Sequence, residues 1–410
     1  MCVKAQTKTD MKIQSLLIVL SFLFTGITGS TSATNDTTNT NNNSTVQHTT
    51  APDHKPFTKE FSYIADLCAN MNGGLKTGTT FLGMANIMAG FNTEYAGLWK
   101  GGQFYINAAA THGKSLSGEF IGDYQVVSNI DAGNHIYLHE LWYRHSISGF
   151  EITIGLQDMN VAFANSENGS HFINSSFGVP SVISCNIPAP IFPLTAPGVT
   201  SKLSISESVV LKAAIWDGCP TAFDRNTNNL NWHLKRDDGT LLNAEIEIAS
   251  RLLKMPGIFK VGYYYHSGYI EKSADTGSKT EVFKNNYGFY LLADQTLWKQ
   301  NAGEQKLGMF AQLAISPERI NRHHLYIGGG INYSGFSHKQ LSDVVGLAFA
   351  CAMFNQNTIS HETTIEIYYK KCFGQHLFIQ PDLQYVISPA GTPGLLPNAL
   401  VGVVRFGVFL

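Results

Sequence analysis

Charged residues are scarce in this chain of 410 amino acids. Asp, Glu, Lys and Arg make up 14% of it, against about 25% in an ordinary soluble domain. The formal net charge is only −2, so there is no basic excess of the kind that binds nucleic acid. Long apolar runs are also missing beyond residue 24. The longest, Val344 to Phe354, is shorter than the about 20 residues that a membrane-spanning helix needs.

The cysteine spacing and the search for common catalytic motifs give no sign of a disulfide framework, a metal site or an enzyme. Five of the six cysteines lie beyond residue 33 at irregular spacing, which predicts neither a disulfide framework nor a zinc site. Cys185 and Cys219 flank a proline-rich loop, and whether they pair stays open. His135, His139 and Glu140 do not form a metal motif, because residues four apart on a strand are separated by about 13 Å. No P-loop, GxSxG or GxGxxG motif sits at a strand–helix junction. We therefore predict no enzyme activity, no metal site and no cofactor.

The first 56 residues predict export from the cytoplasm. Residues 1–33 resemble a secretory signal peptide, with lysines, the apolar run Leu16 to Phe24 and a small-residue cleavage site. Whether translation starts at Met1 or Met11 stays open. Residues 34–56 are rich in Asn and Thr, have nothing to bury, and are predicted to be a disordered polar linker.

A period of two dominates the rest of the chain. Glycine (38 residues), phenylalanine (25) and tyrosine (17) are plentiful, and beyond Leu75 apolar residues alternate with mixed ones, as they do on β-strands. Residues 57–74 instead carry apolar side chains at helical spacing, which predicts a short N-terminal helix. About sixteen strands are expected, at residues 76–90, 101–112, 120–130, 134–146, 149–158, 199–207, 209–218, 241–252, 257–268, 285–299, 306–316, 323–335, 342–355, 362–373, 376–388 and 398–410.

Each of these segments has one apolar face and one face that mixes charged and aromatic residues, and the mixed face distinguishes a barrel from a β-sandwich. In residues 362–373, the apolar Ile365 and Ile367 alternate with Glu366 and Tyr368. A sandwich core would have to pair every buried charge, whereas a water-filled lumen accommodates charges beside aromatic rings. In a bilayer, only a closed barrel lets the backbone N–H and C=O groups of all its strands form hydrogen bonds. Residues 75–410 are therefore predicted to be an all-β, transmembrane antiparallel β-barrel.

Two segments complete the predicted barrel. The final run, Asn398 to Leu410, alternates between an apolar face and a face that carries Arg405, which is typical of a strand that seals a barrel. The long connection at residues 162–198 is rich in Phe, Asn, Ser and Pro. We expect it to fold into the lumen and narrow it.

Short motifs spread over residues 65–410 support a family resemblance. They are Asp66-Leu67 with Asn72 to Leu75, His139 to Tyr143, Phe163 to Ser166, Phe172 to Phe177 with Val179-Pro180, Ile379 to Tyr385, Pro389 to Gly391 and Asn398 to Arg405. In combination they resemble the carbohydrate-selective porins of the OprB type. The resemblance implies a sixteen-stranded barrel that passes sugars by diffusion. The chain departs from the family at Gln340, where an Arg is usual, and at its terminal Leu410, where a Phe is usual.

Inward-facing side chains are the candidates for pore lining and sugar contact. Aromatic rings can lie along the apolar faces of a sugar, and charged or amide groups can exchange hydrogen bonds with its hydroxyls. Each candidate has the alternative of only bracing the wall against a neighbouring strand. The candidates are Glu245, Glu247, Arg251, Lys260, Tyr264, Phe310, Glu362, Glu366, Tyr368, Lys370, Gln380, Asp382, Gln384 and Arg405.

The function predicted from these features is an outer-membrane porin of a Gram-negative bacterium. Small sugars would be the permeants, outer-membrane lipids would surround the barrel, and the barrel assembly machinery would insert it. No nucleic-acid partner is expected, and whether the protein forms a homo-oligomer stays open. The alternative is a secreted or surface β-protein that binds glycans or partners without a pore.

Overall fold

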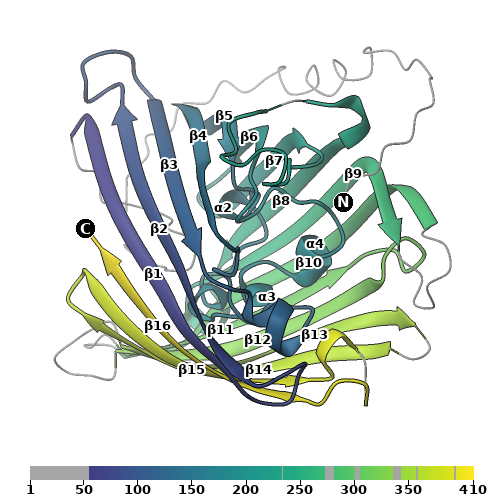
Figure 1. The fold of residues 1–410 in the computed structure, drawn as a ribbon. Helices are drawn as coiled ribbons and strands as arrows, with labels where there is room; N and C mark the ends of the chain where they lie inside the picture. Colours follow the sequence, from purple (N-terminus) through teal and green to yellow (C-terminus); the bar gives the residue numbers. More distant parts are fainter. Residues whose placement is uncertain are drawn as a thin grey trace.

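Sixteen antiparallel strands form one closed barrel, in which β1 pairs with β16 to complete the ring (Figure 1). The computed structural model describes residues 55–232, 234–272, 281–300, 305–335, 343–356, 359–391 and 394–410. The predicted signal peptide and nearly all of the predicted linker lie outside these ranges. The predicted barrel architecture is confirmed.

The strands are β1 (Phe57–Asn72), β2 (Gly78–Asn92), β3 (Gly102–His112), β4 (His135–Ile147), β5 (Phe150–Gln157), β6 (Ala196–Ser204), β7 (Val209–Asp217), β8 (Thr240–Ser250), β9 (Gly257–Lys272), β10 (Glu281–Lys299), β11 (Lys306–Ile315), β12 (His323–Ser334), β13 (Val344–Gln356), β14 (Ile359–Phe373), β15 (Leu377–Ile387) and β16 (Ala399–Phe409).

Helical segments are short. Within the described ranges, no helix is long and apolar enough to cross a membrane. Three of the helices, α2, α3 and α4, belong to the connection between β5 and β6 and lie inside the ring of strands (Figure 1). The helical segments are η2 (Ser117–Ile121), α2 (Met159–Ala162), η3 (Gly169–His171), α3 (Ser175–Gly178), α4 (Ser181–Ser184), η4 (Arg236–Asp238), η5 (Leu252–Lys254) and η6 (Pro389–Gly391).

The connections differ between the two ends of the barrel. Ser148 and Gly149 join β4 to β5, and their φ angles of 45° and 84° are both positive, as in a two-residue type I′ turn. We call the end that contains this hairpin the turn end. At the opposite end, the loop end, residues 113–134, 158–195 and 218–239 form long connections. Short turns at one end and long loops at the other are typical of outer-membrane barrels.

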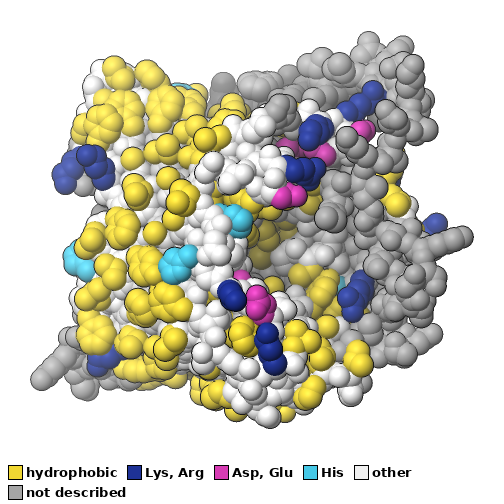
Figure 2. Space-filling view, in the orientation of Figure 1, with side chains coloured by type: hydrophobic (Ala, Val, Ile, Leu, Met, Phe, Trp, Pro, Cys, Tyr) yellow, Lys and Arg dark blue, Asp and Glu magenta, His cyan; other side chains and the backbone are white. Residues whose placement is uncertain are grey.

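The strands present an apolar face outward and a mixed face inward, as the alternation predicts. On β14, Ile367 is 46% exposed on the outside, whereas its neighbour Glu366 is fully buried on the inside. Apolar side chains cover the outer surface of β1, β2 and β3, where charged side chains are sparse (Figure 2). This surface matches the hydrocarbon region of a bilayer.

Residues 57–72 form strand β1, so the predicted N-terminal helix at residues 57–74 is wrong. Ser62, Ile64 and Cys68 are buried in the barrel interior, whereas Leu67 is exposed, which is the period of a strand and not of a helix. β1 pairs with β2 on one side and with β16 on the other. Without it, β2 and β16 would both leave unpaired backbone groups facing lipid. Closure of the barrel therefore overrides the helical spacing.

The predicted strand at residues 120–130 is also wrong. Ser117–Ile121 form the π-helical segment η2, and the residues after it run without strand pairing along the inside of the wall. Ile121, Val127 and Ile130 are buried there, so their apolar character is explained by packing within the lumen. The expected number of strands is nevertheless correct, because β1 takes the place of this segment.

Cys185 carries a free thiol. It follows α4 inside the barrel, and its Sγ lies 3.7 Å from the carbonyl oxygen of Tyr124. The Cys185–Cys219 disulfide that the sequence left open is therefore not formed.

The apolar core lies between the wall and the loops that fold inward. The larger cluster packs Phe163, Phe172 and Phe177 of the connection at residues 158–195 against strands β7 to β14. The smaller cluster packs residues of the connection at 113–134 against β1, β2 and β16. The two inward loops thus fill part of the interior of the barrel.

The outward position of Ile367 leads to a first prediction. We expect Ile367→Lys to lower barrel stability by about 2–4 kcal/mol, because it places a charge near the middle of the lipid-facing surface. The folded fraction after refolding into lipid vesicles, read from heat-modifiable electrophoretic mobility, measures the effect. Ile367→Ala is the matched control. Equal folding of the two variants would contradict the assignment of this face to lipid.

Candidate functional site

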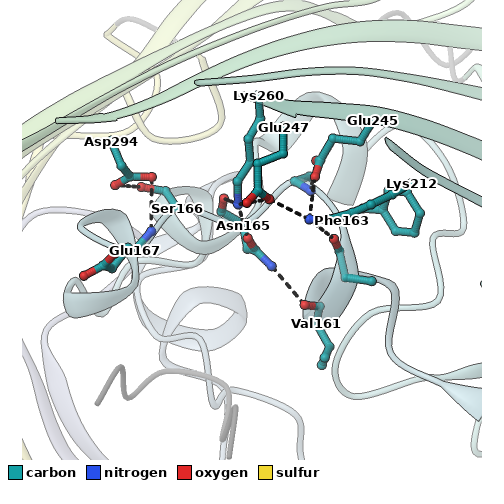
Figure 3. Close-up of polar contacts among 12 residues, drawn as sticks. Val161, Phe163, Asn165, Ser166, Glu167, Lys212, Glu245, Glu247, Lys260 and Asp294 are labelled. Carbon is teal, nitrogen blue, oxygen red and sulfur yellow. Dashed lines mark hydrogen bonds and ion pairs between the residues drawn. The ribbon is translucent and has the colours of Figure 1, made fainter. Parts of the chain in front are cut away.

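The connection at residues 158–195, which we call the plug loop, is held inside the barrel by carboxylates of the wall. Asp294 on β10 accepts hydrogen bonds from the backbone N–H of Asn168 at 2.8 Å and from the hydroxyl of Ser166 at 2.8 Å, the second of which is drawn in Figure 3. Asp158, the first residue of the loop, accepts from the backbone N–H of Phe192 near the loop's end at 3.1 Å. The prediction that this connection folds into the lumen is confirmed.

Two further carboxylates anchor the plug loop. Glu366 on β14 accepts from the backbone N–H groups of Ile173 at 2.6 Å and Asn174 at 3.0 Å. Glu245 on β8 accepts from the backbone N–H of Ala164 at 2.9 Å. Hydrogen bonds to an ionised acceptor are about twice as strong as neutral ones. Each of these glutamates therefore satisfies backbone donors that the loop could not satisfy alone.

Aromatic packing fixes the middle of the plug loop. The ring of Phe172 meets Tyr368 edge-on with centroids 4.8 Å apart, and the ring of Phe177 meets Phe310 at 5.8 Å. Phe310 and Tyr368 are each 1% exposed. These two wall aromatics are therefore covered by the loop and do not face open lumen.

The connection at residues 113–134 forms a second inward loop. Glu362 on β14 accepts from the backbone N–H groups of Tyr124 at 2.7 Å and Gln125 at 2.9 Å. Gln384 on β15 donates to the carbonyl of Val127 at 2.8 Å. The wall from β14 to β15 is therefore occupied by loop anchors.

An ion pair lies at the seam where the barrel closes. Arg405 on β16 lies directly opposite Asp66 on β1 in the strand register, and it donates to both carboxylate oxygens, at 2.7 and 2.8 Å. Ser128 of the second inward loop also donates to Asp66, at 2.7 Å. Both charged side chains are almost fully buried. The pair joins the first strand, the last strand and one loop.

The wall from β4 to β9 carries charged side chains, several of which stay partly exposed inside the lumen. Lys202 lies 2.7 Å from Glu151, and Lys212 lies 2.8 Å from Glu247 (Figure 3 for the latter pair). The side chains of Lys202 and Glu247 are 45% and 25% exposed. We call this set the charged ladder; its members are Arg144, Glu151, Lys202, Lys212, Glu245, Glu247 and Lys260, in strand order. The ladder contains charges of both signs, and its partly exposed members Arg144, Glu151, Lys202 and Glu247 present hydrogen-bond donors and acceptors to the lumen.

An aromatic stack adjoins the charged ladder on β3 and β4. The rings of Tyr105 and Trp142 lie 4.8 Å apart at an angle of 24°, and the guanidinium carbon of Arg144 lies 4.7 Å from the Trp142 ring. All three side chains are partly exposed. Leu141 and Ile147 on the same strand are exposed on the opposite face, so the stack faces the lumen. A flat apolar surface thus borders a row of charges.

Comparison with known proteins places the chain in a family. Residues 78–409 match the family model described as carbohydrate-selective porin, OprB family. The chain belongs to this family. It is similar to Porin B of Pseudomonas aeruginosa, which is 20% identical over 403 residues that cover 86% of this chain and 87% of the relative.

Solved structures agree with the fold of an OprB-family barrel. The high-pH structure of Pseudomonas putida OprB matches with a TM-score of 0.78 at 17% identity, over 87% of this chain and 94% of that one. Outer-membrane-expressed OmpT of Vibrio cholerae matches with a TM-score of 0.51 at 10% identity, over 87% and 98% of the two chains. The family and these outer-membrane barrels locate the protein in the outer membrane of a Gram-negative bacterium. Family and fold are those of a channel.

The structure separates the predicted site residues of this porin into groups. Arg251 stands apart, because β8 ends at Ser250 and leaves Arg251 exposed at the turn end. Glu245, Glu247 and Lys260 belong to the charged ladder, of which Glu245 also anchors the plug loop, and Asp382 is buried beside Gln384 at 3.2 Å. The others contact the inward loops or their neighbours in the wall: Tyr264, Phe310, Glu362, Glu366, Tyr368, Lys370, Gln380, Gln384 and Arg405. Direct contact of any of them with sugar stays a prediction.

Sequence reasoning missed Tyr105, Trp142 and Arg144 as lumen residues. Trp142 was considered only within the family motif His139 to Tyr143. The signal was nevertheless present: Leu141 and Tyr143 alternate with Trp142 and Arg144, and the same period-two rule assigns the latter two to the inner face.

Within the part of the chain that the structure describes, no three His, Cys, Asp or Glu side chains are grouped so as to hold a metal ion.

Proposed function

We propose that sugars diffuse through this porin down their concentration gradient, along the aromatic stack and the charged ladder. The partly exposed stack of Tyr105, Trp142 and Arg144 is the observation that supports this path. A pyranose ring has apolar faces that lie well on an indole, and a rim of hydroxyls that both donate and accept. The adjacent pairs Glu151–Lys202 and Lys212–Glu247 supply acceptors and donors along one wall.

The path proposed for neutral sugars excludes the wall that is covered by loops. Glu366 and Gln384 already satisfy backbone groups of the plug loop and of the second inward loop. A neutral sugar would have to displace those bonds to reach them, at a cost of about 1.5–3 kcal/mol for each bond to a charged group. Four members of the charged ladder, Arg144, Glu151, Lys202 and Glu247, require no such exchange, because their side chains remain partly exposed.

Replacing the indole tests the path. We expect Trp142→Ala to weaken the block of single-channel ion current by glucose about tenfold, because one aromatic face contributes roughly 1 kcal/mol or more. Tyr143→Ala is the matched control: it is the next residue, its ring lies on the outer face, and it contacts Trp99 at 3.0 Å. If both variants bind glucose like the unmodified porin, the stack is not on the sugar path.

The same recordings address the alternative of a surface protein without a pore. Purified, heat-modifiable protein should give stepwise conductance in a planar bilayer. A steady baseline would refute the channel. Insertion by the barrel assembly machinery and contact with outer-membrane lipids are parts of this proposal, and whether the protein forms a homo-oligomer stays open.

A further inference from the structure

One row of inward side chains crosses the barrel wall near the turn end. In the strand registers, Lys306 lies opposite Ser334, Ser334 opposite Val344, and Val344 opposite Lys370. The row continues through Gln380 on β15, which lies opposite Arg405 on β16. Three cations therefore share one level of the lumen.

Two of these cations have carboxylate partners, and the third has none among the residues that the structure describes. Lys306 lies 3.7 Å from Glu167 of the plug loop, and Arg405 forms its two short bonds to Asp66. Lys370 is only 4% exposed, yet it makes no hydrogen bond or ion pair with any residue that the structure describes. Its Nζ lies 4.2 Å from the centroid of the Phe378 ring. The row thus carries one uncompensated positive charge.

The plug loop covers Lys370 with groups that do not neutralise it. Gln380 donates to the carbonyl of His171 at 3.0 Å, which places this histidine next to the row. Burial and the neighbouring charges of Lys370 and Lys306 lower the pKa of His171 to about 3, so the imidazole is neutral at pH 7. Its Nδ1 has no partner among the described residues. A cation, a neutral imidazole with a free ring nitrogen and an aromatic ring thus meet without a carboxylate.

A buried ammonium without a partner is unfavourable, and an anion relieves the cost. Its three N–H donors suit the oxygens of a carboxylate or a phosphate. We propose that Lys370 forms an oxyanion site at the turn end of the lumen, which binds the acidic group of a sugar acid as it crosses the pore. The sugar part of this proposal rests on the proposed function, whereas the oxyanion site does not.

Channel block in planar bilayers tests the site with three probes: gluconate, glucose and inorganic phosphate. In the unmodified porin, gluconate should block the ion current at a concentration about tenfold lower than glucose, as expected for one added hydrogen bond to a charged group. Lys370→Met should abolish this difference by weakening block by gluconate about tenfold. Lys370→Arg should keep it, because it retains the charge.

Lys371→Met is the matched control. It removes the same charge from the next residue, whose side chain lies on the outer face beside Phe373, and it should keep the preference for gluconate. If Lys370→Met weakens block by phosphate but not by gluconate, the sugar-acid assignment is wrong and free phosphate is the occupant. If it changes neither, the oxyanion site is overturned. Failure of glucose to block the unmodified porin would count against the sugar path alone, because the phosphate measurement does not depend on it.

Discussion

Glu366→Ala is expected to open the pore. The substitution removes both acceptors for the backbone N–H groups of Ile173 and Asn174, and buried backbone donors that lose a charged partner cost about 1.5–3 kcal/mol each. The middle of the plug loop should therefore leave the wall. Single-channel conductance should rise, and block by glucose should weaken, while the heat-modifiable barrel persists because all strand pairing is retained.

Thr364→Val provides the control for this experiment. Thr364 lies two residues earlier on the same inner face of β14, is fully buried, and its hydroxyl has no partner in the described part of the chain. The substitution is close to isosteric and breaks no bond to the loop. It should leave conductance and block unchanged. Unaltered conductance in Glu366→Ala would show that the aromatic contacts hold the loop without the carboxylate.

Arg405→Met should destabilise the barrel most strongly. It leaves the carboxylate of Asp66 buried at the closing seam with only Ser128 as a partner, and breaking one side of a buried ion pair costs about 3–5 kcal/mol. Unfolding by urea in detergent or lipid, followed by tryptophan fluorescence, measures the loss. The fraction that closes into a heat-modifiable barrel should fall in parallel.

The double variant Arg405→Met with Asp66→Leu separates pairing from packing. Replacing both partners by apolar groups removes the unpaired charge, so most of the stability should return. If the double variant is as unstable as Arg405→Met alone, the loss comes from packing or from Ser128, and the ion pair is not what stabilises the seam.

The candidate site was predictable only up to the face on which each residue lies. Period-two alternation correctly assigned Glu366 to the lumen and Ile367 to the outside. It could not distinguish a side chain that anchors a loop from one that faces open water. Glu366 and Glu247 follow the same pattern in the sequence, yet the first is fully buried under the plug loop and the second is 25% exposed.

The sequence by itself determined the barrel, its outer and inner faces and its family, because alternation is a local property of each strand. Tertiary structure alone decided that residues 57–72 close the ring, that the connection at residues 113–134 joins the plug loop in the lumen, and that Lys370 is left without a hydrogen-bonding partner among the described residues. These outcomes depend on contacts between distant residues. Glu366 bonds to a residue 193 positions away and Arg405 to one 339 positions away. No local pattern encodes such distances; they are fixed only when the closed sheet brings its first and last strands, and the loops between them, around one interior.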